Sequence, residues 1–284
     1  MLDALRAEAA KIGRHKATWG LVWIYPIVLL GIIGLIVVMT LVNGGDVVDK
    51  PPSLAEWLDD AAAFWGAPRQ AVARMLIAAY VAVVFAGEYG WNTWKLIVPH
   101  RARARLLAAK YALVLILFAI AFMLAAMLFT AGVWTDDVMS GDPIPAGITF
   151  AGLAGAHGTA ALGAIAPVLV TIGYASLAAI LTRSMVGALI VSIVMIAVES
   201  IIGSFAPMLA MYLPSAMWAL AHFLPGYHLA NLASWIDSGE ALSMPFPNGA
   251  VLALGWTASL AVVAAWIAGL TGAAFALFRR QDIN

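Results

Sequence analysis

Residues 111–134 read YALVLILFAIAFMLAAMLFTAGVW, a run in which no side chain carries a charge. A helix of about 20 predominantly apolar residues crosses a bilayer core about 30 Å thick. Five further stretches meet the same requirement, near residues 20–42, 71–90, 158–181, 184–206 and 250–278. Because hydrocarbon tolerates no unpaired backbone groups, the sequence predicts six transmembrane helices in a single all-α integral membrane domain over residues 1–284.

The composition of the whole chain requires membrane lipid as a partner. Of its 284 residues, 64% are apolar and 11% are charged, whereas a soluble domain is typically about 45–50% apolar and about 25% charged. The 15 Lys and Arg balance the 15 Asp and Glu, and no basic segment indicates binding to nucleic acid. The chain contains no cysteine, which excludes disulfides and thiolate metal ligands.

The distribution of Lys and Arg predicts the orientation of the spans, because cytoplasmic loops retain these residues. With the N-terminus inside, twelve of the 15 lie in cytoplasmic segments. We therefore expect both termini in the cytoplasm. Residues expected on the cytoplasmic side include Arg101, Arg103, Arg105 and Lys110, and residues expected outside include Asp136, Asp137 and Asp237.

Residues 2–16 have the pattern of a helix that lies on a membrane surface. Leu2, Leu5, Ala9 and Ile12 follow one another at helical spacing among basic residues. This pattern predicts an N-terminal interfacial helix on the anionic inner leaflet. A frayed tail is the alternative interpretation.

A second surface helix is expected after the first span. Ser53 and Glu56 form a capping box, which marks the start of a helix. The large apolar side chains that follow are expected to rest on the outer lipid surface. They are Leu54, Trp57, Leu58, Ala61, Phe64 and Trp65.

Residues 205–248 form a segment much longer than a connecting loop needs to be. Its first part, 205–225, is almost wholly apolar but contains Pro207, Pro214 and Pro225, which prevent one continuous spanning helix. We expect two short helices that enter the outer leaflet and return. This re-entrant hairpin between spans five and six would line a pathway or pack on the spans of the chain itself.

Residues 88–111 read EYGWNTWKLIVPHRARARLLAAKY and join spans two and three. An acid closes a span, a glycine-aromatic turn follows, a short amphipathic helix ends at a proline, and a basic helix leads into the next span. This order resembles the cytoplasmic elbow of type-2 permeases of ATP-binding-cassette (ABC) exporters. The matching positions are Glu88, Gly90, Thr93, Pro99, Arg103 and Lys110, while Asn92 before Thr93 and His100-Arg101 in place of Ser-Arg depart from the family pattern.

The resemblance implies a permease subunit of an ABC exporter in the cell membrane of a bacterium, which moves a substrate and performs no chemistry itself. It implies a coupling helix within 91–100 that docks on a separate cytoplasmic ABC ATPase. That ATPase would bind ATP and Mg²⁺, with no cofactor in this chain, and a second permease copy or a related permease would complete a dimer. We expect Trp94 to anchor the ATPase and Glu88 to hold the elbow through Arg101 or Arg103. The plainer interpretation of the basic loop is a topology signal.

Motifs for covalent or nucleotide chemistry are absent from the sequence. It contains no P-loop, no Gly-x-Ser-x-Gly and no His-Glu-x-x-His, and no metal site is expected. Glu199 lies deep in a span, where it would line a translocation path or titrate, or else hydrogen-bond a neighbouring helix. The rival function is an integral-membrane enzyme acting on a lipid through Glu88, Glu199 or the histidines His157, His222 and His228. A non-catalytic sensor or immunity protein of the same fold is a third.

Overall fold

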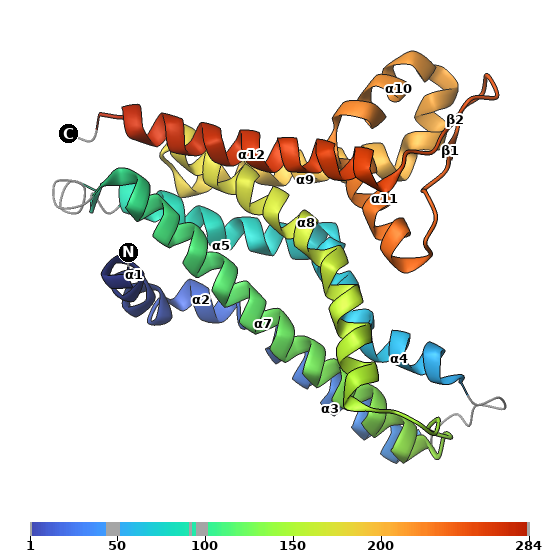
Figure 1. The fold of residues 1–284 in the computed structure, drawn as a ribbon. Coiled ribbons are helices and arrows are strands. Elements are labelled where there is room, and N and C mark those ends of the chain that lie inside the picture. Colours follow the sequence, from blue (N-terminus) through green and yellow to red (C-terminus); the bar gives the residue numbers. More distant parts are fainter. Residues whose placement is uncertain (1, 44–51, 91–92, 95–101, 283–284) are drawn as a thin grey trace.

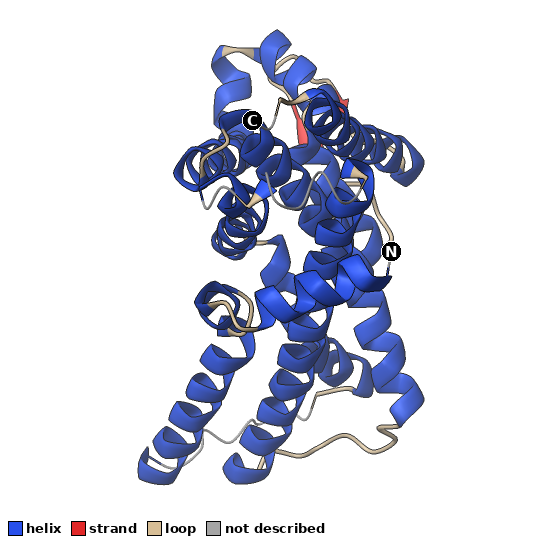
Figure 2. Cartoon of the chain, turned by 90° about the vertical axis from the view of Figure 1, so that its left-hand side faces the viewer, coloured by secondary structure: helices blue, strands red, loops and turns tan. Residues whose placement is uncertain are grey.

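The computed structural model describes residues 2–43, 52–90, 93–94 and 102–282. Within them the chain is all-α apart from one antiparallel pair of two-residue strands, and six helices are long and apolar enough to cross a membrane, as predicted. Helices make up nearly all of the described chain in Figure 2. The six are α3 (Ile24–Asn43), α5 (Ala71–Gly90), α7 (Arg103–Ser140), α8 (Phe150–Thr182), α9 (Met185–Tyr212) and α12 (Trp256–Arg280). The shorter elements are α1 (Leu2–Gly13), α2 (Lys16–Leu21), α4 (Leu54–Ala62), the 3₁₀ helix η1 (Ala63–Arg69), α10 (Pro214–Phe223), α11 (Pro225–Asp237), β1 (Met244–Pro245) and β2 (Val251–Leu252).

Helices α5 and α8 form the centre of the molecule. Their most apolar windows are 67% and 72% buried, against 17% for α3 and for α12. Helix α5 packs on α8 and α9, α8 also packs on α12, and α3 runs beside α7 (Figure 1). The outer helices keep broad exposed apolar faces, which need lipid or another protein to cover them.

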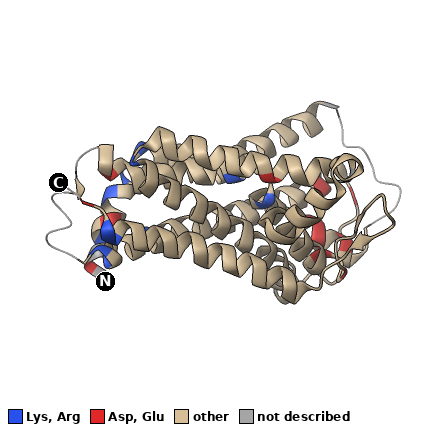
Figure 3. Cartoon of the chain, turned by 90° about the horizontal axis from the view of Figure 1, so that it is seen from above, with Lys and Arg blue, Asp and Glu red and all other residues tan. Residues whose placement is uncertain are grey.

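Charge distinguishes the two ends of the molecule. Helix α1 and the C-terminal end of α12 lie at one end, here called the proximal end, and α4 lies toward the other, the distal end (Figure 1). Figure 3 shows most Lys and Arg gathered at the proximal end and most Asp and Glu toward the distal end. Helix α7 has 38 residues, about 57 Å at 1.5 Å per residue, so it carries Arg103 and Asp137 at opposite ends of the molecule.

Helix α4 begins with the predicted capping box, but its apolar stripe lies on protein. The Ser53 hydroxyl accepts from the Glu56 N–H at 3.2 Å, and the Glu56 carboxylate accepts from the Ser53 N–H at 2.8 Å. Trp57 is only 2% exposed, packs edge-on against Trp134 at 5.8 Å and donates to Asp137 at 2.7 Å. The expectation that this stripe rests on lipid is therefore wrong, because α7 and α8 cover it.

The proline-rich segment after the fifth span forms α10 and α11. Pro214 and Pro225 each stand in the first turn of a helix, where the missing N–H would have no intrahelical partner in any case. Helix α9 runs on to Tyr212, beyond the predicted end of the fifth span at residue 206. Helix α11 packs on α8, α9 and α12, while Phe223 at the end of α10 is 74% exposed.

Helix α1 packs along α7 and turns part of its polar face inward. Ile12 is buried and Leu5 packs against the main apolar core. Glu8 is also buried, whereas Arg6 and Arg14 are exposed. Protein therefore covers one side of α1, including a carboxylate that the amphipathic pattern assigns to its polar face.

Candidate functional site

Four charged side chains meet where α1, α5 and α7 converge, and we call Glu8, Lys11, Glu88 and Lys110 the elbow cluster. Glu88 and Lys110 are fully buried. The Lys110 ammonium donates to Glu88 at 3.0 Å, to Glu8 at 3.1 Å and to the Val84 carbonyl at 3.0 Å. Lys11 also pairs with Glu88, and burial lowers the pKa of Lys11 from 10.5 to about 8. Two ammonium groups thus balance two carboxylates in a site largely closed to water.

The described part of the elbow closes over this cluster. The Thr93 hydroxyl donates to the Glu88 carboxylate, and the Thr93 N–H donates to the Glu88 carbonyl at 3.1 Å. The centre of a Trp94 ring lies 5.3 Å from the Lys110 ammonium, within the range of a cation–π contact. Because Trp94 is only 3% exposed, it anchors the elbow to its own chain. The expectation that Trp94 is presented to a partner does not fit this position.

Of the two cations that we expected to pair with Glu88, Arg101 lies outside the described residues and Arg103 contacts another helix. Arg103 instead donates to the carbonyl groups of Phe278, Arg279 and Gln281, at 3.2, 3.0 and 2.5 Å. These carbonyl groups end α12 and have no partner within the helix, so Arg103 caps α12 from the first residue of α7. The start of α7 is thereby fixed to the proximal end of α12.

The structure describes only some of the remaining residues of the predicted elbow. Gly90 ends α5, and the side chain of Met185 lies 3.9 Å from where its Cβ would be. Pro99, Arg101 and the rest of the expected coupling helix within 91–100, apart from Thr93 and Trp94, lie outside the described residues. The structure therefore brings Glu88, Thr93, Trp94 and Lys110 together, as a pattern of residues up to 22 positions apart.

A second buried ion pair lies within the spans. Arg74 Nη2 is 2.8 Å from Glu199 Oε2, and each residue is 5% exposed. Arg74 also donates to the Thr171 hydroxyl at 2.8 Å, and the Tyr174 hydroxyl donates to Glu199 at 2.5 Å. We call Arg74, Thr171, Tyr174 and Glu199 the midspan cluster. Glu199 lies 14 residues beyond Met185, about 21 Å along α9, at a depth where ionisable groups are costly and usually functional.

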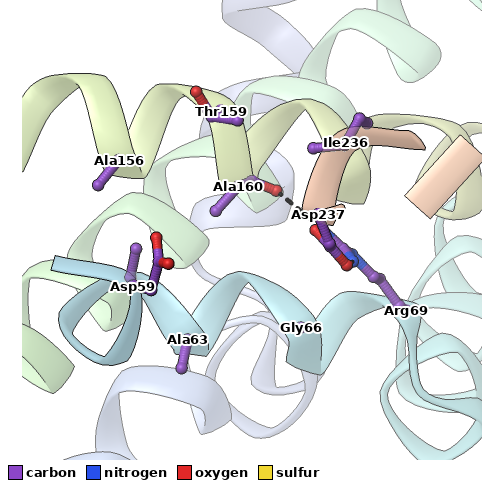
Figure 4. Close-up of a pocket in the computed structure, with 10 residues that line it drawn as sticks. Asp59, Ala63, Gly66, Arg69, Ala156, Thr159, Ala160, Ile236 and Asp237 are labelled. Atoms are coloured by element: carbon purple, nitrogen blue, oxygen red, sulfur yellow. Dashed lines mark hydrogen bonds and ion pairs between the residues drawn. The ribbon is translucent and has the colours of Figure 1, made fainter. Parts of the chain in front are cut away.

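Two cavities meet at Arg69 on the distal side of the midspan cluster. The Glu199 cavity has a volume of about 400 Å³ and adjoins the Arg74–Glu199 pair. The α4 cavity, about 410 Å³, lies between α4, η1, α8 and α11. Arg69 lines both cavities and pairs with Asp237 at 2.6 Å, and Figure 4 shows the two side chains pointing toward each other. Gly163 makes room for Arg69, since a Cβ there would lie 2.1 Å from the guanidinium.

The partners of His157, His222 and His228 are groups other than the buried carboxylates. His157 bonds to the Trp65 indole N–H at 3.1 Å, and His228 bonds to the Ser259 hydroxyl at 3.0 Å and the His222 carbonyl at 2.9 Å. Burial lowers the pKa of His228. Of the described residues that line the two cavities, none is a histidine. Among all the residues that the structure describes, no three His, Asp or Glu side chains form a group that could hold a metal ion.

No family model, no curated protein and no solved structure matches this chain. The site therefore has to be interpreted from its geometry alone. That geometry defines a class: a chain with six helices of spanning length, which suggest a multi-pass membrane protein, and two separate buried ion clusters at different depths. Both clusters are placed to hold helices together, and the one within the spans also borders a cavity.

Reasoning from the sequence missed Glu8, Lys11 and Arg74 as site residues. Glu8 and Lys11 belong to the helix that was expected to lie on the anionic surface of the inner leaflet. Arg74 was assigned to the outer end of the second span. Depth gives a usable signal, because Arg74 lies 16 residues from the proximal end of α5 and Glu199 lies 14 residues from the proximal end of α9, and intramembrane charges usually pair with one another.

Proposed function

We propose that the chain is the membrane-spanning permease subunit of an ABC exporter, working as a dimer with a second copy or a related permease. A separate cytoplasmic ATPase would bind ATP and Mg²⁺ and drive transport, and this chain would carry out no covalent chemistry. One observation carries the proposal: the elbow cluster holds both ends of the segment that joins α5 to α7, through the ion pairs of Glu88 and Lys110.

Contacts at the two ends of this segment connect it to helices α1, α5, α7 and α12. Glu88 near the end of α5 binds Lys110 in α7 and Lys11 in α1, and Arg103 binds the end of α12. Removing one partner of a buried ion pair typically costs about 3–5 kcal/mol. A displacement of the elbow would therefore be transmitted to α5, α7 and α12 together, because moving one alone would break the buried Glu88–Lys110 pair or the partly buried bonds of Arg103 to the end of α12.

The proposed orientation places the proximal end in the cytoplasm, with both termini inside. The clustering of Lys and Arg at that end supports it, since cytoplasmic segments retain basic residues (Figure 3). Arg6, Arg14 and Lys16 are exposed near α1. In this orientation they would contact the anionic headgroups of the inner leaflet, with α1 as an interfacial helix held to the protein by Glu8 and Lys11.

Helices α10 and α11 would form the re-entrant hairpin of the outer leaflet. Trp218, Leu213 and Phe223 leave 39%, 58% and 74% of their surface exposed, which favours contact between α10 and lipid. Buried His228 and Asn231 in α11 are instead satisfied by Ser259 on α12, at 3.0 and 2.8 Å. A hairpin with one lipid-facing helix and one protein-facing helix meets the requirement that polar groups at membrane depth have partners.

Co-purification tests the proposal. The chain, tagged at its C-terminus, is extracted from its native membrane in mild detergent, and retained proteins are identified by mass spectrometry. We expect an ATPase subunit with a P-loop in a fixed ratio to the chain, and less of it with Glu88→Gln. Asp59→Asn, exposed at the distal end, is the control and should retain it fully. Recovery of the intact chain without any ATPase contradicts the proposal and favours a chain that acts alone.

Labelling of single cysteines tests the orientation, and the absence of native cysteine keeps the background low. Arg105→Cys and Asp136→Cys lie near opposite ends of α7. An impermeant maleimide added to intact cells should label position 136 and spare position 105. Labelling of position 105 alone would reverse the proposed orientation.

A further inference from the structure

The Glu199 cavity has the form of a ligand site within the membrane. Its volume of about 400 Å³ falls in the range of small-molecule sites, about 300–1,000 Å³. The walls are mostly small or apolar, and the polar groups converge from three elements. Those polar residues are Arg69, Gln70, Arg74, Glu199, Ser200 and Ser204.

Each partner of the Arg74–Glu199 ion pair, at the base of this cavity, is also held by a neighbouring hydroxyl group. The Thr171 hydroxyl holds Arg74 from one side, and the Tyr174 hydroxyl holds Glu199 from the other. Apart from their ion pair, Arg74 Nη2 and Glu199 Oε2 have no hydrogen-bond partner in the part of the chain that the structure describes. Each charge would therefore keep one fixed contact if a ligand separated the two.

The cavity has exposed lining residues in three places, at Gln70 after η1, at Ala230 on α11, and at Gly203 and Ser204 on the spanning helix α9. Gly203 and Ser204 line the cavity and are exposed, and their neighbours Ile201 and Phe205 are 54% and 49% exposed. A helix surface of this kind faces lipid when α9 spans the membrane. Entry along this surface favours an amphiphile whose headgroup slides in from the leaflet over a solute that arrives from water.

The charges in and around the cavity select the headgroup. Arg74 is matched by Glu199, and Arg69 is matched by Asp237 at 2.6 Å. A simple anion or cation would leave one unbalanced charge in a poorly hydrated site, which is costly. A zwitterion keeps the balance, because its anionic group can pair with Arg74 while its ammonium group pairs with Glu199.

We propose that the Glu199 cavity binds the zwitterionic headgroup of a lipid-like amphiphile, with the Arg74–Glu199 pair opening to receive it. Arg69 lines both this cavity and the α4 cavity, and its side chain pairs with Asp237 (Figure 4). That this headgroup belongs to the transported substrate rests on the proposed function, whereas binding is a property of this chain alone.

The test measures lipid binding to the purified, delipidated chain by native mass spectrometry, without any ATPase. The probes are phosphatidylethanolamine, which is zwitterionic, and phosphatidylglycerol, which is anionic, with identical acyl chains. We expect the chain to bind the zwitterionic lipid about tenfold more tightly, a difference that one charge-assisted contact can supply. Equal affinity for the two lipids would overturn the proposal.

Two glycine variants make the test specific to the cavity. Gly203 is one helical turn from Glu199 on the same face, and a Cβ there meets no atom within 4 Å. Gly203→Leu should therefore place a side chain in the cavity beside Glu199 and lower affinity for phosphatidylethanolamine about tenfold. Gly66→Leu, at an equally open glycine of the α4 cavity, is the matched control and should bind as the unmodified chain does. Unchanged binding by Gly203→Leu would overturn the proposal.

The double variant Arg74→Gln/Glu199→Gln tests the role of the charges. It removes both charges together and should bind the two lipids equally.

Glycerophosphoethanolamine tests the source of the ligand. Stabilisation of the chain by this soluble headgroup but not by the lipid would mean entry from water and would overturn entry from the leaflet. An ATPase that co-purifies while lipid binding fails would leave the proposed function standing and remove this inference alone.

Discussion

The elbow cluster and the midspan cluster both hold charges out of water, but they differ in what the charges can do. The elbow cluster contains two lysines and two glutamates near the end of the spans, and Lys11 is 35% exposed there. The midspan cluster contains an arginine, which does not lose its proton in proteins. In the first, burial lowers the pKa of Lys11 to about 8, so this lysine can lose its proton. The second depends on Glu199 remaining as the partner of Arg74. The two clusters are therefore expected to differ in how well they tolerate the loss of one charge.

This difference matches the tasks we propose for the two regions. A joint that transmits motion benefits from several alternative ion pairs, because one can weaken while others persist. A binding site benefits from a single pair held at fixed positions by Thr171 and Tyr174. Variants that remove one charge at a time separate the two behaviours.

The largest effect is expected for Glu199→Leu. It leaves Arg74 charged and buried, with Thr171 as its remaining side-chain partner among the described residues. The loss of one partner of a buried pair typically costs about 3–5 kcal/mol. The measurement is thermal unfolding of the purified chain in detergent, followed by tryptophan fluorescence. The matched variant is Arg74→Met, which should cost clearly less, because it leaves no permanently charged guanidinium and the remaining carboxyl group still accepts from Tyr174. Equal losses for the two variants would contradict the asymmetry.

The second effect, about 2–3 kcal/mol, is expected for Lys110→Met. This change leaves Glu8 and Glu88 with Lys11 as their shared cation, so one carboxylate is in excess. Adding Glu8→Gln restores the balance and should recover about 1 kcal/mol in the same unfolding assay. A double variant that is less stable than Lys110→Met would show that the cluster does not act as a charge-balanced unit.

The sequence predicts the helices of this fold well and their neighbours poorly. Six apolar runs and a capping box at Ser53 depend on local pattern, and both appear in the structure. The stripe around Trp57 was expected on lipid but lies on α7 and α8, because an apolar stripe shows only that something must cover it. Lipid and protein satisfy that requirement equally.

Local pattern also limits how much of the two clusters could be predicted from the sequence. Glu88 and Lys110 stand in one continuous segment, so their pattern was visible before the structure. Arg74 and Glu199 are 125 positions apart, and only the packing of α5 against α9 brings them together. Charge pairs between distant helices need depth to be compared between spans, which residue spacing within one segment cannot supply.

The smallest effect is expected for Lys11→Met, which sharpens the comparison from its tolerant side. Lys11 is the most exposed member of the elbow cluster, so solvent screening limits its contribution to about 0.5–1 kcal/mol. Lys110 keeps its contacts with both carboxylates in this variant. The unfolding temperature should therefore fall only slightly. The fraction of ATPase retained should fall clearly, because α1 loses one of its two ion pairs with Glu88 and Lys110. Arg14→Met, exposed at the end of the same helix, is the control and should change neither quantity. A loss of stability as large as that of Lys110→Met would mean that the elbow cluster tolerates no change, and the distinction between the two clusters would fail.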